Sequence, residues 1–394
     1  MNEKQIVELE EKIMANTFAK RNLIITKGKG ALVWDINGNE YIDCTSSYGV
    51  AVVGHCHPRV VKAVQRQVET LIACHASFYN DSRSELLEKI INIAPKGLDK
   101  VFLSNSGAES VECAIKLARK YSSKTEIIGM VGAFHGKTMG ALSATWKKKY
   151  RAPFMPLVPG FKHVPPNNLE KVKKAITEQT AAILVEPIRG EGGIRVNSDD
   201  FLPGLREICD EKDVLLICDE VQTGFGRTGK VFACEHWDVV PDIICLAKSV
   251  AGGLPMGATF AKENVMAAFK RGEHSSTFSG NPLVCAAASA AIDVLVEEKL
   301  PERAATNGNY FKGKLETLAE KHKMIREVRG LGLMLGMEMR FDVYNILMEC
   351  MKQGVLVLDA GRNIVRFLPP LVIEKQQINK VVEALDKAME KENN

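Results

Sequence analysis

Two residues of opposite charge stand at the ends of apolar runs, and together they could do chemistry. The run "VLLICD" ends on Asp219, and the run "IICLAK" ends on Lys248. A lone lysine at a strand end is usually solvated, and a lysine near an aspartate often forms only a structural salt bridge. The functional alternative is a pyridine cofactor that carries an aldehyde. The aldehyde would condense with the amine of Lys248, and Asp219 would pair with the protonated ring nitrogen.

Two further predicted strand ends offer what such a cofactor needs. "KVFLSNSGAES" runs from a strand into a helix, which makes backbone N–H groups available to a phosphate, although such a turn is often only a helix cap. The stretch lacks GxGxxG and GxxxxGK[ST], which disfavours a dinucleotide or a nucleoside triphosphate. "GAFHG" ends another strand with Phe134, whose ring can stack on a pyridine. The combination of the four strand ends favours the cofactor interpretation.

The elements that must position these residues form an alternating pattern. Continuous apolar runs and helical patterns take turns through the middle of the chain, and such runs are typical of parallel strands buried on both faces. Ligands bind beyond the carboxyl ends of parallel strands. The pattern predicts an α/β fold with a mostly parallel sheet flanked by helices. The expected strands are 100–103, 126–131, 181–187, 213–219, 242–248 and 256–262, and the expected helices include 107–120, 169–179 and 202–212.

The pattern changes after a helix predicted at 282–300. A charged helix follows from about 302 to 322, then strands within 325–340 broken by Gly330 and Gly332, further strands in "GVLVLDA" and "NIVRFLPPLVI", and a closing helix at 375–391. We expect a large cofactor-binding domain at 51–300 and a smaller α+β domain at 301–394. The segment 1–50 is expected to join the small domain and to contain a hairpin that turns at Asn37-Gly38.

Composition disfavours several classes of protein. The chain is 46% hydrophobic and 25% charged, as in ordinary globular proteins, and its net charge of +4 does not by itself indicate nucleic-acid binding. No uncharged apolar run reaches 18 residues, and the first residues have neither a signal-peptide nor a transit-peptide pattern, so we expect no membrane association. The ten cysteines form no CxxC pair, which predicts reduced thiols in the cytoplasm. The histidines and the cysteine in "GHCHP" are consecutive, so their side chains point in different directions, and we expect no metal site.

At this point the chain resembles the class III, fold-type I pyridoxal-phosphate aminotransferases over nearly its whole length. Within that family it is similar to the acetylornithine aminotransferase group, and most of all to the branch that acts on lysine or ornithine attached to a small amino-group carrier protein. The stretches "YIDCTSSYGVA", "ATWKKKYRAPFMPLV" and "IREVRGLGLM" point to that branch. The family resemblance itself lies in "GKGALVWDINGNEYID", "GHCHP", "NSGAES", "FHGKT", "EPIRGEGG", "DEVQTGFGRTG", "LAKS", "TFSGNPL" and "RFLPPLVI".

The resemblance implies pyridoxal 5'-phosphate as the cofactor and assigns its contacts. Lys248 would carry the cofactor and then move a proton between substrate carbon and cofactor, while Asp219 would pair with the ring nitrogen. Thr277 would reach the phosphate of a neighbouring subunit, which implies a homodimer. The other implied cofactor contacts are Val221 and Phe134 on the two ring faces, Gln222 near the phenolic oxygen, Gly107 and Ala108 at the phosphate, and Glu220 beside Asp219.

The resemblance also implies the reaction. Glutamate and 2-oxoglutarate would form one half-reaction, and a terminal amine with its semialdehyde would form the other, in lysine or arginine biosynthesis. Ser276 would lie at the substrate, and Glu191 and Arg366 would form a gate. Free Arg366 would bind the α-carboxylate of glutamate, and the closed pair would admit the longer donor. Carrier-linked lysine or ornithine is the first expected donor, with acetylornithine and free ornithine as alternatives. An aminomutase and a non-catalytic binding protein are the rival classes.

Four positions bear on the choice of substrate. Lys137 stands where the family usually has an arginine that clamps a substrate carboxylate, and a lysine binds as a point charge rather than a fork. Arg189 replaces a usual glutamine near the gate, and Phe18 replaces a common tyrosine. Tyr48 stands where ornithine aminotransferases also have tyrosine. The run "WKKKYR" at 146–151 is either a solvated loop or a landing patch for an acidic carrier protein.

Overall fold

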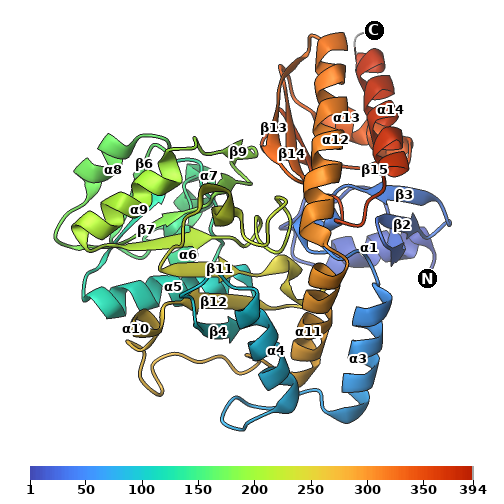
Figure 1. The fold of residues 1–394 in the computed structure, drawn as a ribbon. Coiled ribbons are helices and arrows are strands. Elements are labelled where there is room, and N and C mark those ends of the chain that lie inside the picture. Colours follow the sequence, from blue (N-terminus) through green and yellow to red (C-terminus); the bar gives the residue numbers. More distant parts are fainter. Residues whose placement is uncertain (393–394) are drawn as a thin grey trace.

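The computed structural model describes residues 1–392, and a sheet of seven strands forms the centre of this part of the chain (Figure 1). The strand order is β4-β12-β11-β10-β7-β5-β6. Only β12 runs antiparallel to its neighbours, so the other six strands all point the same way. The strands are Lys100–Ser104 (β4), Glu126–Met130 (β5), Phe161–Val164 (β6), Thr180–Val185 (β7), Leu215–Asp219 (β10), Ile243–Leu246 (β11) and Gly257–Ala261 (β12).

Both faces of this sheet are buried, as the continuous apolar runs predict. Every residue of β7 is buried, and successive side chains enter opposite cores: Ile183 belongs to one cluster, and Leu184 to the other. Successive side chains of a strand point to opposite faces, so in a strand covered on both sides the side chains of both faces are buried. The covering helices include Asp81–Asn92 (α4), Gly107–Ser122 (α5), Leu169–Ala175 (α8) and Phe201–Lys212 (α9), with the short helices Met139–Ala144 (α6) and Glu263–Met266 (α10).

A second sheet joins the two ends of the chain. Its order is β1-β2-β3-β15, from Ile25–Lys29 (β1), Leu32–Asp35 (β2), Glu40–Asp43 (β3) and Val355–Leu356 (β15). The predicted hairpin is confirmed between β2 and β3, where Gly38 has a φ of +83° and the Asp35 carboxylate accepts N–H groups from Asn37 and Asn39. The N-terminal strands therefore pair with a C-terminal strand. The helices Glu3–Ile13 (α1) and Ser46–Gly49 (α2) flank this region.

A third sheet lies in the C-terminal part, in the order β13-β14-β17-β16. The two strands predicted in 325–340 are present, but Gly330 lies inside the first strand and the chain turns at Gly332. The strands are Ile325–Leu331 (β13), Met334–Met339 (β14), Leu358–Asp359 (β16) and Ile364–Phe367 (β17). The helices of this part are Leu300–Lys321 (α12), Tyr344–Lys352 (α13) and Lys375–Glu392 (α14). The domain boundaries at 50 and 300 stay a prediction.

Two helix boundaries differ from those expected. The helix predicted at 169–179 ends at Ala175, because the chain then turns into β7 with the N–H of Thr180 bonded to the carbonyl of Thr177. The helix predicted at 282–300 ends at Glu297, where Lys299 adopts a left-handed conformation between α11 (Pro282–Glu297) and α12. Helix α11 packs against α4 and against Pro58–Thr70 (α3), and these helices lie to the right and lower right of the central sheet in Figure 1.

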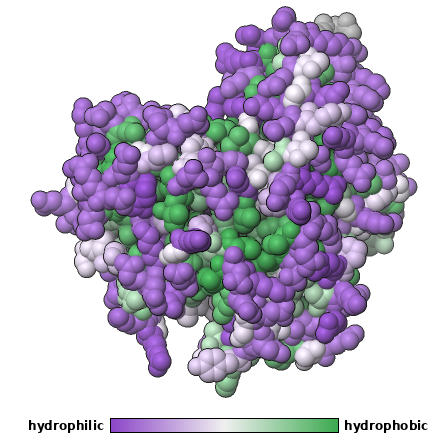
Figure 2. All heavy atoms as spheres, viewed as in Figure 1, coloured by the Kyte–Doolittle hydropathy of each residue, from purple (hydrophilic) through white to green (hydrophobic). Residues whose placement is uncertain are grey.

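The face drawn in Figure 2 is mostly polar. Figure 2 shows hydrophobic side chains gathered over the middle of one face, between more polar outer parts. Among residues 1–392, no helix combines the length and the apolar character that crossing a membrane would need.

The central strands tolerate little loss of packing. Replacing Ile183, which is fully buried in β7, by alanine removes buried methyl groups and leaves a cavity. We expect Ile183→Ala to lower the free energy of unfolding by about 3 kcal/mol. The measurement is a thermal or urea melt. Val240→Ala, at a position that is 37% exposed, is the control and should change stability by less than about 0.5 kcal/mol. Equal effects of the two substitutions would contradict the two-sided burial of β7.

Candidate active site

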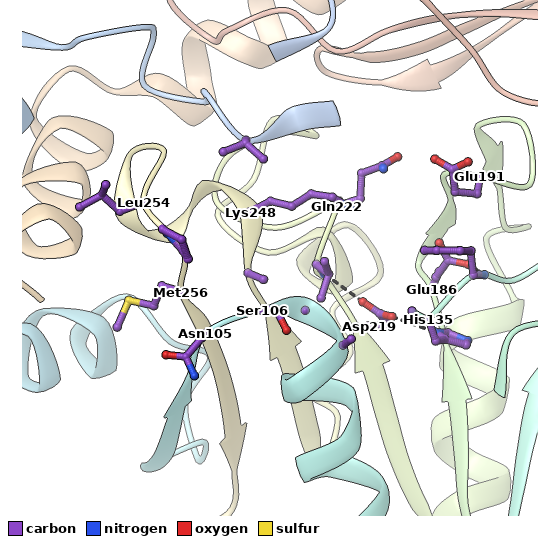
Figure 3. Close-up of a pocket in the computed structure, with 18 of the residues that line it drawn as sticks. Asn105, Ser106, His135, Glu186, Glu191, Asp219, Gln222, Lys248, Leu254 and Met256 are labelled. Atoms are coloured by element: carbon purple, nitrogen blue, oxygen red, sulfur yellow. Dashed lines mark hydrogen bonds and ion pairs between the residues drawn. The ribbon is translucent and has the colours of Figure 1, made fainter. Parts of the chain in front are cut away.

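A cavity of about 420 Å³ opens at the carboxyl edge of the central sheet (Figure 3). The turn after β4 supplies residues 105–108, β5 is followed by Phe134, and β7 is followed by Glu186. Strand β10 ends on Asp219, and Lys248 follows β11. Six strands point to this edge, so groups that are far apart in sequence meet here.

Lys248 directs its amine into this cavity. Its backbone adopts a φ of +47°, a left-handed conformation that is costly for a lysine and is typical of functional sites. Burial lowers the pKa of Lys248, while the negative charges of Asp219 and Glu191 partly oppose that shift. Within residues 1–392, the amine makes no hydrogen bond to another protein group. A buried amine with a lowered pKa is suited to attack an aldehyde, because attack needs the neutral form.

Asp219 is held from two sides. One carboxylate oxygen lies 2.7 Å from His135 Nδ1, and the other accepts the N–H of Val221 at 3.0 Å. Burial lowers the pKa of His135, but the hydrogen bond and charge of Asp219 outweigh burial and leave that pKa above its ordinary value. The bonds to His135 and Val221 fix the orientation of the Asp219 carboxylate. Sequence reasoning missed His135, although it lies in the quoted motif "FHGKT" next to Phe134.

Glu186 is a second buried carboxyl group that sequence reasoning missed. It accepts N–H groups from Phe134 at 3.0 Å and from Gly190 at 3.2 Å. Burial raises the pKa of Glu186 to about 7, with the charge of Asp219 adding to the rise and that of His135 opposing it. Its position directly after β7 is the signal that could have found it, since β7 ends at the same sheet edge as β10.

The turn after β4 forms the floor of the cavity. The hydroxyl of Ser106 caps helix α5 by accepting the N–H of Glu109 at 3.2 Å. A side chain at Gly107 would bring its Cβ to 2.6 Å from Val221, so only glycine fits between the turn and that residue. Asn105 donates to the hydroxyl of Ser276 at 2.8 Å, which ties the loop containing Ser276 to this turn.

The expected gate residues form an ion pair at the far side of the cavity. Arg366 Nη1 lies 2.6 Å from a carboxylate oxygen of Glu191. Burial raises the pKa of Glu191, but the charge of Arg366 and the hydrogen bond from it outweigh burial and keep that pKa below its ordinary value. The guanidinium also lies 5.3 Å from the centre of the Tyr48 ring. Glu191 is shared with a second cavity of about 930 Å³, which Tyr48 and Phe18 also line.

Most of the expected cofactor residues line the first cavity, namely Gly107, Ala108, Phe134, Asp219, Val221, Gln222 and Lys248. Glu220 does not, which corrects its grouping with them. Its carboxylate points into the protein interior, accepts a bond from Thr223 and caps the segment Ala233–Trp237 through the N–H of Cys234. Two successive residues at a strand end face opposite sides, so Asp219 and Glu220 cannot both face the cavity.

Several expected cofactor and substrate residues lie outside the first cavity. Thr277 and Lys137 are exposed, and Lys137 Nζ lies 5.4 Å from the centre of the Tyr150 ring. Arg189 is not free near the gate: it is buried and bonds to the side chain of Asn197 at 2.5 Å. Among the residues described, no three His, Cys, Asp or Glu side chains gather as a metal ion would require.

Comparison with known proteins decides the family. The sequence model described as "Aminotransferase class-III" matches residues 13–389. This chain belongs to the class-III aminotransferases. It is 50% identical over 384 residues to an acetylornithine aminotransferase of Methanopyrus kandleri, covering 97% of this chain and 98% of the relative. It is 45% identical to a [LysW]-aminoadipate semialdehyde transaminase of Deinococcus radiodurans, covering 96% of this chain and 89% of the relative.

The structural comparison agrees. The chain superposes on the crystal structure of the ornithine aminotransferase of Toxoplasma gondii ME49 with a TM-score of 0.96 at 35% identity, covering all of this chain and 96% of that one. A second structure of the Toxoplasma gondii enzyme reveals pyridoxal phosphate at partial occupancy in its active site. The class-III aminotransferase described here therefore has the α/β architecture of fold-type I enzymes and uses pyridoxal phosphate as its cofactor.

The cavity fits this cofactor on its own chemistry. It holds the partly buried Lys248, whose amine can take the aldehyde, and a buried carboxylate at Asp219 for the ring nitrogen. The side-chain oxygen of Gln222 is buried and has no hydrogen-bond partner among the described residues, so it is available to a ligand hydroxyl. Backbone N–H groups at the start of α5 offer sites for a phosphate.

Glu186 makes the stability of this aminotransferase depend on pH in a particular direction. A carboxyl group whose pKa is raised by folding binds a proton more readily in the folded state, so the folded state gains from it at low pH. Stability should therefore fall as pH rises from about 5 to about 7 and then level off. Glu186→Gln should remove this part of the dependence. The measurement is the thermal midpoint of both forms between about pH 5 and pH 8. A constant difference between them would contradict a raised pKa.

Proposed function

We propose that this class-III aminotransferase transfers the terminal amino group of an N-acylated ornithine or lysine to 2-oxoglutarate. The observation that carries the proposal is the convergence of Lys248 and Asp219 in one buried cavity whose far side is the Glu191–Arg366 ion pair. An amine and a carboxylate placed to hold an aldehyde-bearing pyridine suit amino-group transfer. An ion pair that can open or close suits an enzyme that takes two amino donors of different length.

The residues of the site have separate tasks in this proposal. When bound, pyridoxal phosphate supplies an aldehyde and an electron-withdrawing ring that stabilises negative charge on the substrate carbon. Lys248 holds the cofactor and then moves the proton at the substrate carbon, since its lowered pKa suits general base catalysis. Asp219, oriented by His135, keeps the proton on the ring nitrogen. Gln222 would hold the phenolic oxygen, and Phe134 and Val221 would pack on the two faces of the ring.

The Glu191–Arg366 pair is proposed to select between donors. The guanidinium of Arg366 is buried and suits a bidentate bond to the α-carboxylate of glutamate. In the structure, Glu191 is hydrogen-bonded to that guanidinium, so Arg366 is not free to bind the carboxylate of a donor. In this closed form the cavity accepts the terminal amine of a longer donor, whose carboxylate lies farther out.

N-acetylornithine is the best-supported donor. Relatives of 44 to 50% identity carry the name acetylornithine aminotransferase. A lysine or ornithine linked to an amino-group carrier protein is the second candidate, favoured by the [LysW]-aminoadipate semialdehyde transaminase of 45% identity. Free ornithine is the third, favoured by the similar ornithine aminotransferase structures. The same terminal-amine chemistry serves arginine or lysine biosynthesis.

We also propose that the enzyme is a cytoplasmic homodimer. The ten cysteines are free, and eight of them are buried, which suits a reducing compartment. Phe78, Tyr79 and Phe278 are large apolar side chains that are 65% exposed or more, and Phe278 is adjacent to Thr277. A second copy that covers these rings would bring Thr277 to the neighbouring active site.

A half-reaction panel tests the proposed donor. Cofactor-loaded enzyme is mixed separately with N-acetylornithine, N-acetyllysine, carrier-linked lysine and ornithine, and the loss of cofactor absorbance is followed. We expect N-acetylornithine to react at least about tenfold faster than ornithine, since a site built for an acylated amine discriminates by about that factor or more. A fastest reaction with carrier-linked lysine would select the second candidate, and one with ornithine the third.

The panel also separates the rival classes. Turnover should require 2-oxoglutarate, because the amino group leaves the donor molecule. Turnover without it would indicate an aminomutase. No absorbance change with any amine, in protein that retains the cofactor, would indicate a binding protein and would contradict the proposal.

A further inference from the structure

The second cavity, of about 930 Å³, lies where the far end of a long donor would extend. It shares Glu191 with the cofactor cavity, so the two spaces meet at the Glu191–Arg366 pair. Its walls come from the N-terminal segment around Phe18, from the turn that carries Lys147, and from the C-terminal part around Tyr344. A donor whose terminal amine reaches Lys248 has to place its carboxylate and its α-nitrogen in this direction.

Most charges on these walls are already paired. Lys20 lies 3.1 Å from Glu10, Arg362 lies 3.2 Å from Asp342, and Glu191 is bonded to Arg366. Arg21 has no carboxylate partner among the described residues and donates to the carbonyl of Val357 at 2.7 Å. The cations of these walls that lack a carboxylate partner are therefore Arg21 and the lysines of the turn that follows α6.

Three lysines of that turn and its neighbourhood have no carboxylate partner among the described residues. Lys147 is half-buried, lines the cavity and donates to the backbone carbonyl of Glu191 at 2.9 Å. Lys149 also lines the cavity, and its Nζ lies 5.0 Å from the centre of the Tyr150 ring. Lys137 Nζ lies 5.4 Å from the same ring. We call these residues, Lys137, Lys147 and Lys149, the lysine cluster.

Tyr150 connects the lysine cluster to the cofactor cavity. Its ring packs edge-on against Phe134, with 5.9 Å between the ring centres, and Phe134 lines the cofactor cavity. Ammonium groups near an aromatic ring are attracted by its negative face, which holds Lys137 and Lys149 close without neutralising them. The cluster is thus positioned beside both the gate and the ring that borders the cofactor cavity.

Charges of both signs act on the amine of Lys147. Burial lowers its pKa, Glu191 and Asp359 act to raise it, and Lys149 and Arg366 act to lower it. Asp359 lines the same cavity and forms no ion pair among residues 1–392, so it is the carboxylate that could attract a cationic ligand group. Lys147, Lys149 and Arg21 line the cavity without a carboxylate partner, against this single unpaired carboxylate, so the surplus of charge is positive.

We propose that the lysine cluster binds the carboxylate of the ω-amino donor and repels a free α-ammonium group, so that the enzyme selects donors whose α-amine is acylated. This inference rests on the proposed function and names its substrate class. Acylation turns the α-ammonium into a neutral amide, so the outer end of the donor carries only the negative carboxylate. A free diamino acid carries a positive charge one carbon away from that carboxylate, which cancels the attraction.

Lys147 is the specificity-determining residue in this account, because it is the least exposed member of the cluster and bonds next to the gate. Lys137 is exposed and lines neither cavity, and a single exposed lysine binds a carboxylate weakly. Lys147 and Lys149 add two further positive charges that attract the carboxylate of the donor. The same positive surface suits the acidic group of a carrier-linked donor equally well, so the inference covers both N-acylated candidates.

The test compares Lys147→Gln with Lys148→Gln, because Lys148 is exposed on the same turn and does not line the cavity. The readout is kcat/KM for N-acetylornithine and for ornithine with cofactor-loaded enzyme. We expect Lys147→Gln to lower kcat/KM for N-acetylornithine about tenfold, the size of one partly buried charge contact, and to leave ornithine unchanged or faster. Lys148→Gln should change neither substrate. Lys147→Arg should keep the preference, and Lys149→Gln should lower it less.

The outcomes separate this inference from the proposed function. Equal losses for both substrates in Lys147→Gln, with bound cofactor retained, would overturn the inference and leave the aminotransferase assignment in place. Loss of ornithine activity in Asp359→Asn together with an unchanged preference in Lys147→Gln would also overturn it, because Asp359 would then recruit the α-ammonium. Wild-type enzyme inactive toward every ω-amine would instead refute the proposed function.

Discussion

The burial of the Lys248 amine opposite the Asp219 carboxylate is the constraint on which the rest of the site depends. An isolated buried ammonium or carboxylate is costly unless it is paired, neutralised or bound to a ligand. Asp219 is satisfied by His135 and by the N–H of Val221, whereas the Lys248 amine has a lowered pKa and no protein hydrogen bond among the described residues. The carboxylate of Asp219 therefore already has its hydrogen-bond partners, whereas the amine of Lys248 stays available to a ligand.

The sheet makes this arrangement possible. Six of the seven central strands run in one direction, so the turns after β4, β5, β7, β10 and β11 all meet at one edge. Each turn brings a different chemical group to that edge. Beyond that edge, the Glu191–Arg366 pair separates the cofactor cavity from the larger outer cavity. From the sheet outward, the site therefore has room for the cofactor first, then the ion pair, and then the outer end of the donor.

Sequence reasoning predicted the parts of this structure that depend on local patterns. Continuous apolar runs predicted six of the seven central strands, all but β6, and Lys248, Asp219 and Phe134 were expected at the ends of these strands. It failed where a side chain's direction depends on packing. Glu220 was grouped with the cofactor residues, but it alternates to the opposite side and caps a buried turn. His135 and Glu186 were missed because their roles come from partners more than 50 residues away or from deep burial. Arg189, expected to add a cation near the gate, is buried and bonded to Asn197.

The central claim is most directly tested by finding which lysine holds the cofactor. Holoenzyme is treated with borohydride, which reduces the double bond between the cofactor and its lysine to a stable single bond, and the peptides are then mapped by mass spectrometry. The account predicts that the added mass of reduced pyridoxal phosphate lies on Lys248 alone. Added mass on a different lysine, or on no residue of protein that holds the cofactor, would contradict it.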